Sequence, residues 1–279
     1  MVTELATLLA RHQLVDWADR ILATQRPSLR LGSLRRGRLV ARIGGMPRLN
    51  VADLWPEADG KPLSFIAEVD LAAASSLLGE GTLPANGYLE FFYDAEQEAW
   101  GFDPADRPKW RVLWVRNDAT RRDLPLGLPD DVRFTPVDLE GHVEPTYAEW
   151  ESWHFAKTGM DLNVGLRYAN ALAEWNKARE PKPAVLHRLL GHPDHVQGDM
   201  MLECQLASNG IKVGNLRAPS EAEARLEAGA GDWRLLLQID SDEHSNMSWG
   251  DTGRIYYWIR DEDLRERNWD RVWLVLQCS

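Results

Sequence analysis

The chain has 279 residues, of which 44% are hydrophobic and 27% charged, and its formal net charge is −11. This is the composition of a globular protein that can bury a core, in one large domain or two ordinary ones. The negative charge argues against a nucleic-acid binder, which needs basic surface to displace counterions from phosphates. It is compatible with a basic protein partner.

Cysteine usage and the N-terminus predict a cytoplasmic location. Cys204 and Cys278 lie in apolar contexts without metal-type spacing, as expected of buried free thiols in a reducing compartment. Charged residues such as Glu4 and Arg11 interrupt any apolar signal segment. No window approaches the roughly 18 uncharged apolar residues that a membrane span needs, so no membrane association is expected.

The N-terminal part of the chain predicts one helix followed by strands. Leucines recur at helical spacing over residues 3–24, and Pro27 ends the pattern. Alternating or continuous apolar runs between turn residues then predict strands. The expected elements are a basic strand at 31–42, a Gly-rich loop at 44–47, a strand at 62–70, a helix at 71–78, and strands at 88–93 and 111–115.

The C-terminal stretch 232–278 is the most apolar and aromatic part, and it resembles the stretch 62–115. Its three strand-like runs, 233–240, 254–259 and 271–277, match the earlier runs in order and character. Three matched blocks predict an internal duplication. Residues 117–198, with a helix at 161–179, form a helical and loop-rich connection, and Cys204 falls in an apparent strand.

Several motifs resemble the bacterial DUF1963, or YwqG-like, family of uncharacterised proteins. The matching segments are Gly44-Gly45-Met46-Pro47, Leu54-Trp55-Pro56, 62–70, Leu83-Pro84 to Gly87, 91–94, Leu189-Leu190-Gly191-His192-Pro193, Gln197-Gly198-Asp199, Gln238-Ile239-Asp240, Trp249-Gly250-Asp251 and 272–278. The resemblance runs from about Val40 to the C-terminus and implies a duplicated mixed fold. His192 departs from the pattern, which implies an aromatic residue there, so no family site is placed on it.

We therefore expect an α+β fold, internally duplicated, with two similar, mostly antiparallel β-rich halves and flanking helices. Residues 1–30 would form an N-terminal helix and residues 31–279 a DUF1963/YwqG-like domain. The halves would span about 31–116 and 199–279 and pack as one pseudo-symmetric unit.

One cluster of histidines stands out between the two halves. His187, His192 and His195 lie close to Asp194 and Asp199, and these residue types are ligands for zinc or similar ions. However, Pro193 makes the segment a turn, and the spacing matches no defined metal motif. We expect exposed loop histidines here.

A second polar cluster follows the strand 233–240. Asp240, Asp242 and His244 are the candidate metal ligands, because carboxylates and an imidazole could hold a divalent cation. A solvated connecting loop is the alternative. Trp249 and Asp251 stand beside two glycines in a combination that suits a ligand-facing loop, whereas the same residues could also shape a buried turn.

The sequence leaves two functions open. The sequence contains no recognisable nucleophile–base motif, and this favours a protein-binding module over an enzyme. The resemblance implies a toxin-immunity type of role, with a basic, toxin-like protein as the partner. The alternative is a small-molecule or metal-binding protein with hydrolytic capacity and a cleft between the halves. Its candidate ligand-binding residues are Arg48, Asp70, Gln238, Trp249 and Asp251.

Overall fold

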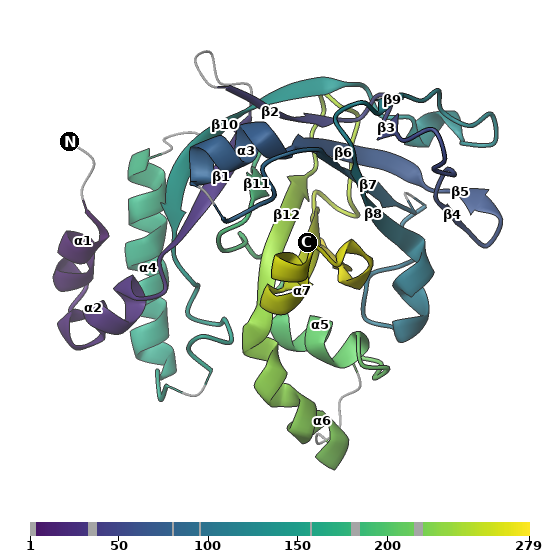
Figure 1. Ribbon diagram of the computed structural model, residues 1–279. Helices are drawn as coiled ribbons and strands as arrows, with labels where there is room; N and C mark the ends of the chain where they lie inside the picture. The colour runs from purple at the N-terminus through teal and green to yellow at the C-terminus, as the bar shows by residue number, and fades with distance from the viewer. Residues whose placement is uncertain are drawn as a thin grey trace.

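The computed structural model describes residues 4–32, 38–79, 81–94, 96–156, 158–179, 185–214 and 220–279. Within these residues one ten-stranded antiparallel sheet dominates (Figure 1). Its strands, in spatial order, are β14 (Trp273–Gln277), β13 (Arg254–Arg260), β12 (Trp233–Asp240), β11 (His187–Leu189), β1 (Arg26–Gly32), β10 (Val137–Thr146), β2 (Arg38–Ile43), β6 (Ser64–Asp70), β7 (Tyr88–Tyr93) and β8 (Trp110–Val115). Two small ladders pair β3 (Arg48–Leu49) with β9 (Thr120–Arg121) and β4 (Glu57–Ala58) with β5 (Lys61–Pro62).

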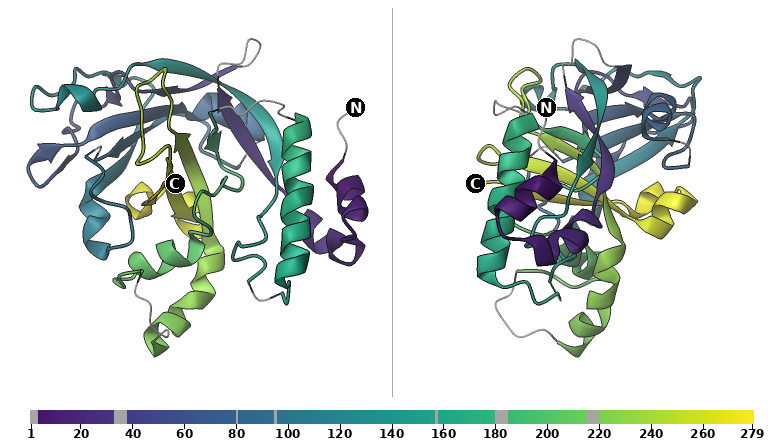
Figure 2. Two further views of the ribbon diagram at one scale, coloured as in Figure 1. Left: turned by 180° about the vertical axis from the view of Figure 1, so that it is seen from behind. Right: turned by 90° about the vertical axis from the view of Figure 1, so that its left-hand side faces the viewer.

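Helices pack on both the core-facing side and the outer side of the sheet (Figures 1 and 2). The α-helices are α1 (Leu5–Arg11), α2 (Val15–Leu22), α3 (Leu71–Leu78), α4 (Leu162–Arg179), α5 (Met201–Ala207), α6 (Glu221–Leu226) and α7 (Asp261–Glu266). Short 3-10 helices span Pro104–Lys109, Asp130–Val132, Glu227–Asp232 and Trp269–Arg271. In the described part of the chain, no helix is long and apolar enough to cross a membrane.

The sheet curls until its two ends meet, so that it is nearly a barrel (Figure 2). The indole Nε1 of Trp110 donates a hydrogen bond of 2.9 Å to the carbonyl oxygen of Val272. Its ring also meets that of Trp273 edge to face, with centroids 5.0 Å apart. Phe91 and Tyr257 form a second such pair at 4.9 Å. These aromatic contacts close the main core between the arms β6–β8 and β12–β14, where edge-to-face rings add to the burial of apolar area.

The prediction of a single helix over 3–24 is wrong in its middle. Gln13 has a φ of +57°, and the amide of Leu14 donates to the carbonyl oxygen of Leu9, so the helix breaks into α1 and α2. Strand β1 then begins at Arg26, inside the segment expected to be helical, and lies at the centre of the sheet. Residues 33–37 of the predicted basic strand lie outside the described residues.

The expected loop-rich connection contains two further central strands. β10 runs for ten residues and pairs with both β1 and β2, and β11 joins β1 to β12. Cys204 lies in helix α5 rather than in a strand, because its stretch packs one face against the core. By contrast, the strands expected at 88–93 and 233–240 and the helix at 71–78 are confirmed.

Candidate functional site

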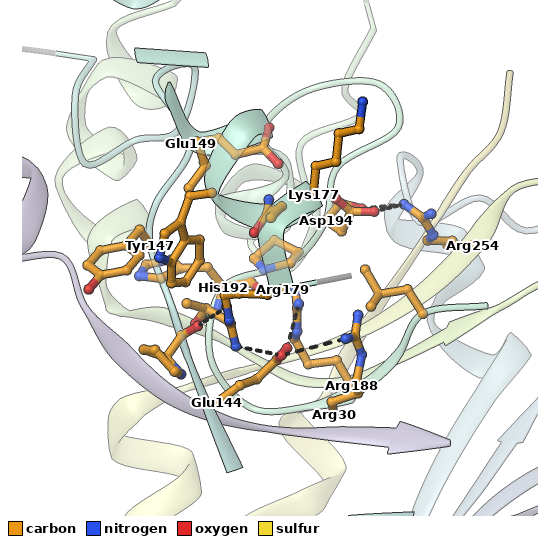
Figure 3. A pocket seen from close by; sticks show the side chains of 17 residues that line it. Arg30, Glu144, Tyr147, Glu149, Lys177, Arg179, Arg188, His192, Asp194 and Arg254 are labelled. Atoms are coloured by element: carbon orange, nitrogen blue, oxygen red, sulfur yellow. Dashed lines mark hydrogen bonds and ion pairs between the residues drawn. The ribbon is translucent and has the colours of Figure 1, made fainter. Parts of the chain in front are cut away.

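A pocket of about 310 Å³ opens between helix α4 and the outer face of the sheet at β1, β10 and β11 (Figure 3). We call it the basic pocket. In β1 the side chains of Leu29 and Leu31 enter the core, so Arg30 between them faces the outer side. Five cationic side chains line the pocket against three carboxylates: Arg30, Lys177, Arg179, Arg188 and Arg254 against Glu144, Glu149 and Asp194.

Three arginines gather around the carboxylate of Glu144 (Figure 3). Guanidinium nitrogens of Arg179 and Arg188 lie 2.9 Å and 3.0 Å from its oxygens, and one of Arg30 lies 3.8 Å away. The Glu144 side chain is 4% exposed, and those of Arg30, Arg179 and Arg188 are 16%, 19% and 11% exposed. Three guanidinium groups thus gather around one carboxylate in a place where water screens charges poorly.

An unusual turn places a chain segment across this face of the sheet. Leu190 and Gly191 both adopt left-handed backbone angles, with φ of +58° and +79°. A Cβ on Gly191 would lie 2.5 Å from the Cβ of Ser28, so the turn requires glycine. The turn lets His192 leave the sheet, and its amide donates to Thr146 Oγ1 at 2.9 Å.

Asp194 fixes the other end of that segment. Its backbone amide donates to Gln238 Oε1 at 2.9 Å, and its carbonyl oxygen accepts from the hydroxyl of Tyr256 at 2.7 Å. Its carboxylate pairs with Arg254, which also pairs with Asp240 at 3.1 Å. Because both ends are anchored, His192, Pro193 and Asp194 form a rigid wall of the basic pocket.

Behind this wall lies a small buried chamber of about 10 Å³. Its lining consists of Arg26, Glu149, Ser152, His154, Gly191, His192, Pro193, His195, Asp199, Met201 and Trp258. Among the described protein groups, several buried polar atoms of this lining make no hydrogen bond: both ring nitrogens of His195, His154 Nδ1, Asp199 Oδ1, Ser152 Oγ and Trp258 Nε1. Such a concentration of unpaired buried polar atoms is typical of functional sites.

The histidines of the chamber have opposed pKa shifts. Burial, with Arg26 nearby, lowers the pKa of His192 to about 2 and that of His154 to about 4. Burial also acts to lower the pKa of His195, but Glu149, Asp199 and Asp194 raise it overall. Burial and Asp199 raise the pKa of Glu203 to about 7. Separated pKa values among neighbouring groups indicate a site that can hold or release a proton.

The expectation of exposed loop histidines is wrong. His187 and His192 are 1% and 4% exposed, and the side chain of His195 is 4% exposed. The turn at Leu190 and Gly191 folds their segment inward, which spacing alone did not indicate. His187 pairs with Asp242 across 3.4 Å, while His192 Nε2 donates to the carbonyl oxygen of Thr24.

The five predicted ligand-binding residues lie outside the basic pocket, in several different places. Arg48 pairs with Glu68 at 3.1 Å and covers the ring of Tyr88, and Asp70 caps helix α3 by accepting from Ala73. Trp249 is fully buried between Tyr93 and Phe134, and Asp251 is exposed. Gln238 alone supports the pocket, through its bond to Asp194.

The three predicted metal ligands are only partly brought together. Asp242 contacts His244 at 3.0 Å, whereas Asp240 turns to Arg254 and to the backbone amide of Leu186. Over the described ranges, no group of three or more His, Cys, Asp or Glu side chains is arranged to hold a metal ion.

Sequence reasoning missed most of the basic pocket. Its cations come from β1, α4, β11 and β13, and no local motif links these elements. The one available signal was the segment Gly191-His192-Pro193 of the family-like motifs, in which His192 and Pro193 line both cavities and Gly191 lines the chamber.

We expect Glu203→Gln to stabilise the protein at about pH 8 but not at about pH 4. The folded state holds the Glu203 proton until about pH 7, whereas the unfolded chain releases it near the ordinary pKa of 4.5. Stability therefore falls as the pH rises through that window, by at most about 3 kcal/mol. Urea unfolding at both pH values, with exposed Glu266→Gln as the control, measures this. An equal gain in the free energy of unfolding at both pH values would contradict the raised pKa of Glu203.

Comparison with known proteins gives one result. The model of a family described as a domain of unknown function, DUF1963, matches residues 41–278. The chain belongs to the DUF1963 family. Among curated proteins there is no match. The DUF1963 region begins within β2, so it contributes all of the basic pocket except Arg30 of β1.

Proposed function

We propose that this DUF1963 chain binds a small organic anion in the basic pocket. The observation that carries the proposal is the convergence of three arginine side chains on Glu144 within a half-enclosed cavity. Arginine suits this role because its planar fork binds carboxylate or phosphate through two parallel hydrogen bonds. A protein of net charge −11 that concentrates cations in one pocket gains selectivity for an anion there.

The remaining walls indicate an apolar part on the ligand. Tyr147, Leu172, Trp175 and Leu186 also line the pocket. The rings of Tyr147 and Trp175 meet edge to face at 5.1 Å, and Arg179 covers Trp175 at 4.2 Å. A volume of about 310 Å³ is at the lower end for ligand pockets. The proposed ligand class is therefore a carboxylate or phosphate with a small aromatic or aliphatic body.

Ligand screening by thermal shift tests the proposal. We expect phenyl phosphate and benzoate to raise the melting temperature, and neutral phenol not to, because only a ligand bound to the folded state stabilises it. Added salt should weaken the effect. An equal shift with phenol would contradict the proposal.

A matched pair of lysine variants locates the ligand. We expect Lys177→Ala to weaken phenyl phosphate binding about two- to fivefold, because Lys177 is an exposed cation on the rim of the pocket. Lys61→Ala removes another exposed lysine, which pairs with Glu96 and lies in the separate β4–β5 ladder, and it should leave the affinity unchanged. Isothermal titration calorimetry measures both. Equal losses in the two variants would place the ligand elsewhere.

We also propose that the two arms of the sheet are duplicated halves. Each arm is a three-stranded antiparallel meander, β6-β7-β8 or β12-β13-β14, at one end of the sheet, which supports the proposal. Helix α3 follows the first strand of its arm, whereas α7 follows the second. Failure of the two meanders to superpose would count against duplication. The protein-partner hypothesis, with its toxin-immunity version, stays a prediction from charge and resemblance.

A further inference from the structure

Glu149 is the one carboxylate that lines both the basic pocket and the buried chamber. On the chamber side its Oε2 lies 3.4 Å from Nδ1 of His195. The Glu149 side chain is 31% exposed, whereas that of His195 is 4% exposed. The pair therefore connects a solvent-accessible carboxylate with an imidazole that bulk water does not reach directly.

The surroundings of His195 favour a charge on its ring. Neither of its ring nitrogens makes a well-formed hydrogen bond to a described protein group. The charged and titratable groups around the pair come from every neighbouring element: Arg26 of β1, His154, Tyr168 of α4, His192 and Asp194 on its own segment, Asp199, and Glu203 of α5. Asp194 is shared with Arg254, and Glu149, Asp199 and Asp194 together favour the protonated ring.

We propose that Glu149 and His195 form a proton-exchange pair, so that an anion enters the basic pocket together with a proton. This inference rests on the proposed function, because it concerns the same pocket. An anion beside Glu149 raises the local negative charge, and a proton on the imidazole offsets that charge. The proton is taken from water, bonds to a ring nitrogen of His195, and leaves the pair neutral instead of negative.

The pKa directions agree with this geometry. Burial acts to lower the pKa of His195, but Glu149, Asp199 and Asp194 raise it overall, so these carboxylates favour the protonated imidazole. Burial lowers the pKa of His154 to about 4 and that of His192 to about 2, so both rings are neutral at neutral pH. Among the histidines of the chamber, His195 is therefore the one that exchanges the proton.

Nuclear magnetic resonance of labelled histidine tests the pair without any ligand. His195→Gln identifies the His195 signal, which should titrate above the ordinary histidine pKa in the native chain. We expect Glu149→Gln to lower its titration midpoint by about one pH unit or more, and Glu149→Asp, which keeps the charge, to restore most of it. An unchanged midpoint in Glu149→Gln, with the variant still folded, would overturn the proposal.

Calorimetry with sulfate tests whether anion binding is coupled to proton uptake. Sulfate does not take up a proton near neutral pH, so titrations in two buffers of different ionisation enthalpy report only the protons that the protein gains. We expect net proton uptake in the native chain and in exposed Glu221→Gln, and a loss of most of it in Glu149→Gln. Uptake that persists unchanged in Glu149→Gln would overturn the pair.

The two hypotheses fail in different ways. If sulfate gives no heat and no thermal shift, the basic pocket does not bind anions and the proposed function fails. If sulfate binds but brings no proton, the proposed function stands and the proton-exchange pair is wrong.

Discussion

Glu144→Gln is expected to lower the free energy of unfolding by about 3–5 kcal/mol. The substitution keeps the shape of the side chain but removes a negative charge that Arg30, Arg179 and Arg188 share. Three poorly solvated guanidiniums would then repel one another. Urea unfolding at neutral pH measures the loss.

A surface variant, Glu221→Gln, serves as the control for the destabilisation expected of Glu144→Gln. Glu221 pairs with Arg225 on helix α6, and both side chains are nearly fully exposed, so Glu221→Gln should cost about 0.5 kcal/mol or less. Phosphate should stabilise Glu144→Gln more than it stabilises the native chain, because it would take the place of the lost carboxylate. Equal losses in the two variants would contradict the electrostatic account of the pocket.

Trp249→Ala is expected to destabilise the protein by about 3–5 kcal/mol. Its ring is fully buried, and it meets the rings of Tyr93 and Phe134 edge to face at 6.0 Å and 5.6 Å. Truncation would leave a large cavity where the loop after β12 closes the core. Thermal or urea unfolding measures the effect.

Two comparisons separate a packing role from a ligand-binding role for Trp249. Trp114 is 37% exposed on the edge strand β8, so Trp114→Ala should cost about 1 kcal/mol. Trp249→Phe, which keeps an aromatic ring in the core, should bind phenyl phosphate as the native chain does. A loss of binding in Trp249→Phe would instead support the sequence hypothesis that this tryptophan faces the ligand.

The parts of the fold that could be predicted are those with a strong local pattern. The runs 88–93 and 233–240 are continuous apolar stretches between turn residues, and they form β7 and β12. Membership in the DUF1963 family could also be predicted from the sequence, because the family's motifs are spread over most of the chain. Turn chemistry at Gly44 and Gly45 was predicted correctly, since both have a positive φ.

The sequence predicts short strands between prolines in this region, but not the single ten-residue central strand β10. Polar residues alternate through β10, which is a strand pattern, whereas Gly141 and Pro145 are both unusual within a strand. Gly141 fits because a Cβ there would lie 2.6 Å from a methyl of Val40. Only the pairing with β1 and β2 on both sides, a long-range property, stabilises this stretch as a strand.

The candidate site could not be predicted for a related reason. Arg30, Glu144, Arg179 and Arg188 are far apart in sequence, and each looks like an ordinary surface charge until the sheet order is known. The histidine segment was noticed, but its inward course depends on the left-handed pair Leu190 and Gly191. A site whose residues come from several strands has no local sequence motif by which it could be predicted.

A crystal structure with 4-bromophenyl phosphate tests the central claim most directly, because anomalous scattering locates the bromine independently of the phosphate. We expect the phosphate to lie against Arg179 and Arg188 and the bromophenyl ring to contact Trp175, within the basic pocket. Bromine located outside this pocket, or no bound ligand at a concentration that raises the melting temperature, would contradict the account.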